Sequence, residues 1–156
     1  MSISVDIDLE YEFEVKAKAA AVFKVLSDVP TSASYFPKIE KLTELRSGVY
    51  QWDMEKVGSA QVNIQTIYAS KYVSNAAKGT VVWTPVKGVG NAQVGGSWKI
   101  IDHKKSTGIT LCIKGLVDVP LPVLMQTVVA PIVQAEFEKL VDTYIDNLIK
   151  KFGGEV

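Results

Sequence analysis

The first thirteen residues after the N-terminal dipeptide alternate strictly between apolar and polar side chains. Positions 3, 5, 7, 9, 11, 13 and 15 are apolar, and Ser, Asp or Glu fills every position between them. Successive side chains of a β-strand point to opposite faces, so the pattern predicts a long strand with one buried and one exposed face. The acidic exposed face would also repel a second copy at the strand edge.

The spacing of apolar residues then changes to that of a helix. Residues 16–27 place apolar side chains three and four apart in alanine-rich sequence, which predicts a short helix. The residue before a proline avoids helical backbone angles, so Pro30 ends it. Residues 31–36 have room for one or two further helical turns before Pro37.

The middle of the chain predicts strands separated by short turns rich in Gly, Ser, Asn and Lys. Short connections favour antiparallel pairing of consecutive strands as a meander. The six expected strands cover about residues 39–46, 49–57, 60–74, 79–86, 92–102 and 106–117.

The last part of the chain predicts one long helix. Apolar side chains recur three to five residues apart over 123–152, after Pro122 and before Gly153. Roughly 30 residues make a helix about 45 Å long. Pro131 lies inside this run and removes a backbone hydrogen bond, which predicts a kink or a break near Ala130.

These elements predict an α+β fold in the order β-α-α-β6-α. Seven strands about 4.8 Å apart span roughly 30 Å, whereas a helix is about 10–12 Å across. One helix covers such a sheet only if the sheet curls around it. We therefore expect a single domain over residues 1–156, with a curved seven-stranded antiparallel sheet around a long C-terminal helix.

Composition excludes several classes of function. Seventeen Lys and Arg balance seventeen Asp and Glu, which argues against nucleic acid as a partner. The most apolar stretch, residues 121–133, is too short and too interrupted to span a bilayer, although transient contact with a membrane surface stays open. The acidic N-terminal segment is unlike a signal peptide, so we expect a cytoplasmic protein. The sequence does not specify an oligomeric state.

No catalytic, metal-binding or cofactor-binding residue is predicted. His103 is the single histidine and lies in a polar turn, and Cys112 is the single cysteine and has no histidine to activate it. One histidine and one cysteine are too few for a zinc site. A carboxylate such as Glu136 or Asp102 would have to supply the chemistry of an enzyme.

Two glycine-rich stretches, Gly88-Val89-Gly90 and Gly95-Gly96, are poor candidates for a phosphate loop. Such a loop needs a helix directly behind it, and the residues after Gly96 read as strand. We interpret these glycines as a loop and as a bulge or a close approach within the sheet.

The inward side of the predicted strands carries all three tryptophans and no Asp, Glu or His between residues 50 and 100. These tryptophans either fill an ordinary core or form the wall of a pocket for a flat apolar ligand, with tyrosine and threonine as polar contacts. The candidate ligand-binding residues, including two from the C-terminal helix, are Tyr50, Trp52, Met54, Ile64, Thr66, Tyr68, Trp83, Trp98, Leu124 and Val128.

Three local stretches and the element order carry a resemblance to a known family. The stretches are VFKVLSDVP at residues 22–30, YFPKI at residues 35–39, and VPLP at residues 119–122, which leads into the long helix. Over essentially the whole chain, the sequence resembles the helix-grip fold of the START-like (SRPBCC) superfamily. That superfamily includes polyketide cyclase/dehydrase-like proteins, coenzyme Q-binding members and plant pollen-allergen homologues.

The resemblance implies an interior that binds a hydrophobic small molecule, such as a lipid, quinone, sterol or polyketide, for transport or sensing. The alternative that it implies is a polyketide cyclase- or lyase-like enzyme acting on an aromatic or polyketide substrate. The family has no shared catalytic motif to carry over onto this sequence, so the resemblance indicates the fold more strongly than the function.

Overall fold

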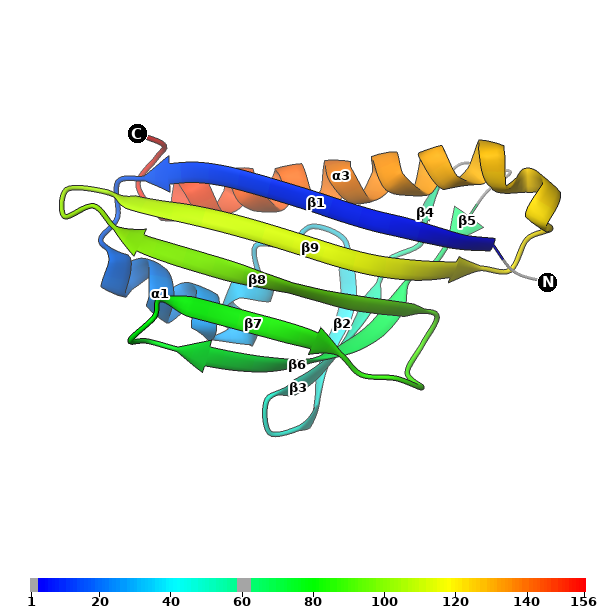
Figure 1. Ribbon diagram of the computed structural model, residues 1–156, viewed down its shortest axis with the longest axis horizontal. Coiled ribbons are helices and arrows are strands. Elements are labelled where there is room, and N and C mark those ends of the chain that lie inside the picture. The colour runs from blue at the N-terminus through cyan, green and yellow to red at the C-terminus, as the bar shows by residue number, and fades with distance from the viewer. Residues whose placement is uncertain (1–2, 59–62) are drawn as a thin grey trace.

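The computed structural model describes residues 3–58 and 63–156 (Figure 1). The first strand and two short helices are β1 (Ile3–Val15), α1 (Ala19–Ser27) and α2 (Val29–Ala33). The strands that follow are β2 (Ile39–Arg46), β3 (Val49–Met54), β4 (Val57–Gly58), β5 (Asn63–Ile64), β6 (Ile67–Asn75), β7 (Thr80–Pro85), β8 (Ala92–Asp102) and β9 (Thr107–Val119). A 3₁₀ turn, η1 (Val123–Met125), leads into helix α3 (Gln126–Lys151).

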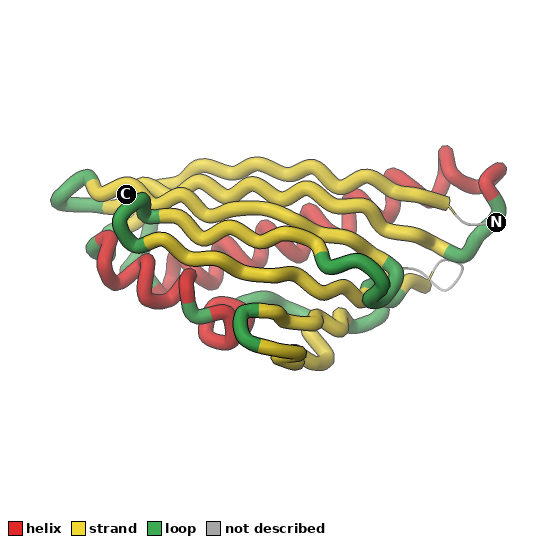
Figure 2. The backbone as a smooth tube through the Cα atoms, turned by 60° about the horizontal axis from the view of Figure 1, so that its bottom comes forward, coloured by secondary structure: helices red, strands yellow, loops and turns green. Residues whose placement is uncertain are grey.

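The seven long strands form one antiparallel sheet in the order β1-β9-β8-β7-β6-β3-β2. The expected curved sheet with one long C-terminal helix is confirmed, and Figure 2 shows α3 running across its concave side. The first strand pairs with the last, from Ile3 opposite Val119 to Val15 opposite Thr107. The chain therefore places its N-terminal strand beside the strand that precedes α3.

The predicted strands 49–57 and 60–74 differ from the structure, and residues 59–62 lie outside the described part of the chain. β3 ends at Met54 and β6 begins at Ile67, while β4 and β5 pair with each other as a separate two-stranded sheet. Where β3 ends, the Met54 amide donates to the Thr66 carbonyl at 3.0 Å and the Glu55 amide donates to the Lys38 carbonyl at 2.8 Å. Alternating polarity shows that a segment is extended, but not which strand it pairs with. The sequence pattern therefore joined β4 to β3 and β5 to β6.

Helix α3 continues from Gln126 to Lys151 through Pro131, so of the predicted kink or break near Ala130 the break does not occur. The side chain of Gln134 donates to the backbone carbonyl of Asp6 at 2.9 Å, which binds the helix to the outer edge of β1. No helix in the described residues is both long and apolar enough to cross a membrane.

Strand parity explains why the interior is apolar. Along β1, the side chains of Ile3, Val5 and Ile7 are almost fully buried, and Ser4 and Asp6 between them are exposed. The same alternation on β7, β8 and β9 directs one apolar face toward α3. The helix presents Val133, Phe137 and other buried side chains to that face, so the core lies between the sheet and α3.

Candidate functional site

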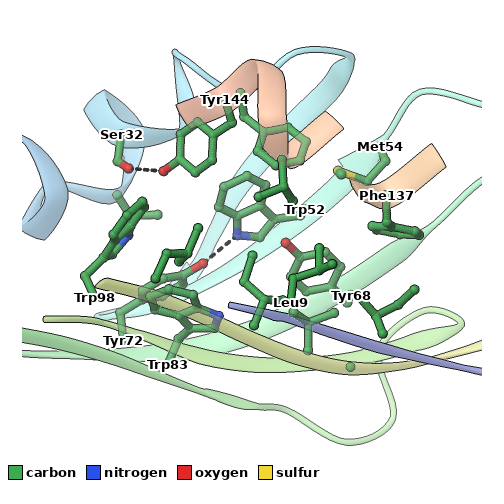
Figure 3. A pocket seen from close by; sticks show the side chains of 18 of the residues that line it. Leu9, Ser32, Trp52, Met54, Tyr68, Tyr72, Trp83, Trp98, Phe137 and Tyr144 are labelled. Atoms are coloured by element: carbon green, nitrogen blue, oxygen red, sulfur yellow. Dashed lines mark hydrogen bonds between the residues drawn. The ribbon is translucent and has the colours of Figure 1, made fainter. Parts of the chain in front are cut away.

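A cavity lies inside the molecule, between the concave face of the sheet, the two short helices and α3 (Figure 3). The sheet contributes Ile7, Leu9, Trp52, Met54, Tyr68, Tyr72, Trp83, Val94, Trp98, Leu111, Ile113, Gly115 and Val117 to its lining. The helices and the turn after α2 contribute Leu26, Val29, Ser32, Phe36, Phe137, Val141 and Tyr144. The open space is about 60 Å³, which is room for a few water molecules.

Six aromatic side chains form a closed circuit of contacts around this cavity, which we call the aromatic belt. Its members, in order of contact, are Trp52, Tyr72, Trp83, Trp98, Tyr144 and Phe36. In five of the six links, the distance between ring centroids ranges from 5.0 Å (Phe36 to Tyr144) to 6.4 Å (Trp83 to Trp98). The sixth link is the hydrogen bond between Trp52 and Tyr72. The belt joins the sheet to α3, because Tyr144 comes from the helix and Trp98 from β8.

Few polar atoms reach the cavity, and most of them are already paired. The indole nitrogen of Trp52 donates to the hydroxyl of Tyr72 at 3.0 Å. The hydroxyls of Ser32 and Tyr144 are hydrogen-bonded to each other, which links α2 to α3. Figure 3 shows the Tyr68 hydroxyl pointing into the cavity, and no hydrogen-bond partner for it occurs among the described residues.

The cavity keeps its tyrosines neutral. Burial raises the pKa of Tyr68 and of Tyr144 above the usual phenol value. For Tyr144, the hydrogen bond with Ser32 lowers the pKa, but by less than burial raises it. Burial also raises the pKa of Tyr72, and the nearby Tyr68 adds to that increase. All three phenols therefore hold their protons at neutral pH, where they can donate hydrogen bonds but cannot act as general bases.

None of the described residues that line the cavity is Asp, Glu, His, Lys, Arg or Cys. The carboxylates of Asp102 and Glu136, which an enzyme mechanism would have needed, do not line it. No group of three or more His, Cys, Asp or Glu side chains in the described residues is placed to hold a metal ion. The arrangement can therefore enclose an apolar molecule and offer it hydrogen bonds from neutral hydroxyls.

Five of the ten predicted site residues line the cavity, namely Trp52, Met54, Tyr68, Trp83 and Trp98. Tyr50 is only partly buried and packs edge-on against Tyr72, outside the cavity lining. Thr66 is buried, its hydroxyl has no hydrogen-bond partner within the described part of the chain, and it too is outside the lining. The side chain of Ile64 lies outside the described residues.

The structure places two of the predicted residues away from this cavity. Leu124 is 94% exposed and Val128 is 61% exposed, and neither lines the cavity. Leu124 belongs to the 3₁₀ turn that precedes α3, whereas Val128 lies on the outer side of the first helical turns. The buried side of α3 passes instead through Val129, Val133 and Phe137, because the packing of the helix on the sheet decides which of its apolar positions face inward.

Among the lining residues that sequence reasoning missed, Ser32, Phe36, Tyr72 and Tyr144 build the aromatic belt and its hydrogen bonds. Tyr72 lies four residues after Tyr68 on β6, so its side chain points to the same face of the sheet. Extending the list of inward-facing residues along this strand would have included it. Tyr144 lies seven residues after Phe137 and so on the same side of α3. The pairing of Ser32 with Tyr144 has no local sequence signal, because 112 residues separate them.

Gly96 leaves room for the indole of Trp83, its partner across the β7–β8 pairing. A Cβ atom at this position would lie 2.6 Å from Trp83 and 2.3 Å from the carbonyl oxygen of Cys112. The strand pairing between β7 and β8 runs through Gly96 without a register shift. Of the two interpretations of Gly95-Gly96, the structure therefore supports a close approach in the sheet, and the indole that approaches is part of the belt.

We expect Cys112→Ser and His103→Ala to leave the fold and any ligand affinity within a few-fold of the parent. His103 is exposed in the β8–β9 turn, 3.5 Å from Glu14, and Cys112 is partly buried on the outward phase of β9. Urea unfolding should show a change of less than about 1 kcal/mol for each variant. A thousand-fold loss of an activity in either variant would assign that residue to catalysis.

The comparisons with known proteins come from structure alone. No protein-family model matches this sequence, and no curated protein sequence matches it significantly. The Zhui aromatase/cyclase from Streptomyces sp. R1128 is similar in structure, with a TM-score of 0.69 and 16% identity over 95% of this chain and 94% of that one. A START superfamily protein from Mycobacterium smegmatis also has a TM-score of 0.69, with 14% identity over 94% of this chain and 97% of that one.

Norcoclaurine synthase from Thalictrum flavum has a TM-score of 0.60 and 19% identity, over 94% of this chain and 86% of that one. These likenesses extend over nearly the whole length of both chains in each pair, so they concern the complete sheet and its helices. The identities are low, and what the chains share is therefore their architecture. This chain has the START-like helix-grip fold.

Proposed function

We propose that this chain, acting as a single domain, binds a hydrophobic small molecule in the cavity enclosed by the aromatic belt, as a carrier or a sensor. The observation that carries the proposal is an interior cavity whose lining is apolar and aromatic and contains no charged side chain in the described residues. Ligand sites commonly combine such a lining with a few polar groups that orient the ligand. Lipids, quinones, sterols and polyketides have the matching apolar character.

The size of the cavity implies that the lining must move when a ligand enters. Its open space of about 60 Å³ is well below the roughly 300 Å³ at which drug-sized ligand pockets begin. Single aromatic contacts contribute about 0.5–1.5 kcal/mol each, so individual belt contacts can separate when a ligand replaces them. We therefore expect binding to widen the space between the sheet and α3.

The test is titration with the uncharged hydrophobic probe N-phenyl-1-naphthylamine. Because all three tryptophans belong to the belt, a bound probe should quench their fluorescence saturably at one probe per chain. The matched variants Ile113→Phe and Leu116→Phe alter opposite faces of β9, the first toward the cavity and the second toward an exposed position. We expect Ile113→Phe to lose most of the probe affinity and Leu116→Phe to keep it, with circular dichroism confirming that both variants fold.

Two outcomes would contradict this proposal. A broad panel of uncharged lipophilic probes that leaves tryptophan emission unchanged would indicate that the interior is a filled core. Equal binding by both phenylalanine variants would place the probe on the outside of the protein. Native mass spectrometry of the protein from its own source would then identify any lipophile that co-purifies with it.

A polyketide cyclase- or lyase-like enzyme is the second candidate, and one observation favours it. The neutral hydroxyls of Tyr68 and Tyr72 face the cavity, where they could polarise a substrate carbonyl. The cavity lining supplies no general base to remove a proton, so binding without catalysis accounts better for the site. Conversion of an aromatic or polyketide substrate by wild-type protein, detected by mass spectrometry and lost in a Tyr68→Phe, Tyr72→Phe double variant, would favour the enzyme.

A further inference from the structure

The polar atoms of the cavity differ in what they still offer to a ligand. Ser32 and Tyr144 bind each other, and the Tyr72 hydroxyl accepts from the Trp52 indole N–H, which leaves Tyr72 only its own proton to donate. The Tyr68 hydroxyl has no partner among the described residues, although its side chain is buried. The hydroxyl faces the open space of the cavity, so the position in front of it is suited to a hydrogen-bond acceptor.

The same cavity has nothing to offer an ionised ligand. No Lys, Arg or His side chain in the described residues lines it, so a carboxylate or phosphate inside would be buried without a counter-charge. Its titratable lining groups are Tyr68 and Tyr72 from β6 and Tyr144 from α3, and all three remain neutral near pH 7. Burying an unpaired ion is far more costly than burying a neutral group with a hydrogen bond.

We infer that the ligand is an uncharged, largely flat molecule with a carbonyl-type oxygen that accepts a hydrogen bond from Tyr68. We infer flatness from the aromatic belt, because its ring faces and ring edges suit an aromatic or conjugated framework. Ketones, quinones and neutral aromatic polyketides fit this description, whereas fatty acids and phosphate-bearing lipid headgroups do not. The inference rests on the proposed function and narrows its ligand class.

Three naphthalene probes of similar size test this. 2-Acetylnaphthalene carries a neutral acceptor, 2-ethylnaphthalene carries none, and 2-naphthoate is ionised at neutral pH. We expect the ketone to bind about fivefold more tightly than the hydrocarbon, which is the gain from one neutral hydrogen bond. The carboxylate should bind at least about 100-fold more weakly than the ketone at pH 7.

Substitution of Tyr68 identifies the donor. Tyr68→Phe should remove the preference for the ketone over the hydrocarbon and leave hydrocarbon affinity within about twofold. The matched control is Tyr11→Phe, because Tyr11 does not line the cavity and its hydroxyl is engaged with Asp142. The control should keep the full ketone preference, and both variants remove only one oxygen atom, so both should fold.

A pH titration separates exclusion of charge from poor shape. If only the protonated acid enters, 2-naphthoate affinity should rise about tenfold for each pH unit lowered from 7 toward 5.5, in proportion to the neutral fraction. The affinity of 2-acetylnaphthalene should stay constant over that range, because the lining tyrosines do not titrate there.

The outcomes distinguish this inference from the proposed function. If none of the three probes binds and N-phenyl-1-naphthylamine also fails to bind, the proposed function is wrong. If all three probes bind with equal affinity, the proposed function stands and the inferred ligand class is wrong. A ketone preference that survives Tyr68→Phe would overturn the assignment of Tyr68, and a naphthoate affinity independent of pH would overturn the exclusion of charge.

Discussion

Replacement of Gly96 by alanine is expected to destabilise the fold by about 3 kcal/mol, at the upper end of the cost of overpacking a core. The new methyl group would lie 2.3 Å from the carbonyl oxygen of Cys112 and 2.6 Å from the Trp83 ring. The first contact is with paired backbone, which cannot move without disturbing β9. The second would push the Trp83 indole into the cavity, so ligand affinity should fall together with stability.

Urea unfolding monitored by circular dichroism measures this effect, and Gly115→Ala is its control. Gly115 also faces the cavity, but a Cβ atom there would be 3.2 Å from its nearest neighbours, the Val94 side chain and the Gln93 carbonyl oxygen. A shift of a few tenths of an ångström would relieve these contacts, so we expect a change below about 1 kcal/mol. Equal stability of the two variants would show that Trp83 does not depend on the missing side chain of Gly96.

The second large effect concerns the docking of α3. Leu148 is fully buried, with 0% of its surface exposed, among side chains from the helix and the sheet. Its replacement by alanine should lower the free energy of unfolding by about 3 kcal/mol, because the cavity left behind adds to the lost apolar contact. Urea unfolding should show a lower midpoint with little change in slope.

The chain contains a matched control for this substitution. Leu124 is the same residue type just ahead of the same helix, but it is 94% exposed. Leu124→Ala should therefore change the free energy of unfolding by less than about 0.5 kcal/mol. A loss of stability at Leu124 equal to that at Leu148 would mean that the segment before α3 is packed against the protein in solution.

The contrast between these two leucines shows where sequence reasoning stopped. The apolar spacing after Pro122 correctly predicted a long helix, and both leucines fit it equally well. Periodicity identifies an apolar side of an element, but it does not say where along its length the element meets its neighbours. That information comes only from packing, which buries Leu148 and leaves Leu124 at the surface.

What the sequence by itself determined was the seven long strands of the main sheet, their inward phase and the curvature of the sheet, but not the short β4–β5 pair. Strict alternation is a local property of extended backbone, so Trp52, Trp83 and Trp98 could be assigned to one face from parity alone. The mismatch in width between seven strands and one helix required the sheet to curl. Neither conclusion needs a contact between distant residues.

Only the tertiary structure decided how that face becomes a site. It pairs β1 with β9, closes the aromatic belt with Phe36 and Tyr144, and joins Ser32 to Tyr144 across 112 residues. These contacts depend on distances between elements far apart in the chain, which no local pattern encodes. The position of the Tyr68 hydroxyl, which faces the cavity without a hydrogen-bond partner among the described residues, has the same origin, because the neighbouring elements decide which partners a side chain meets.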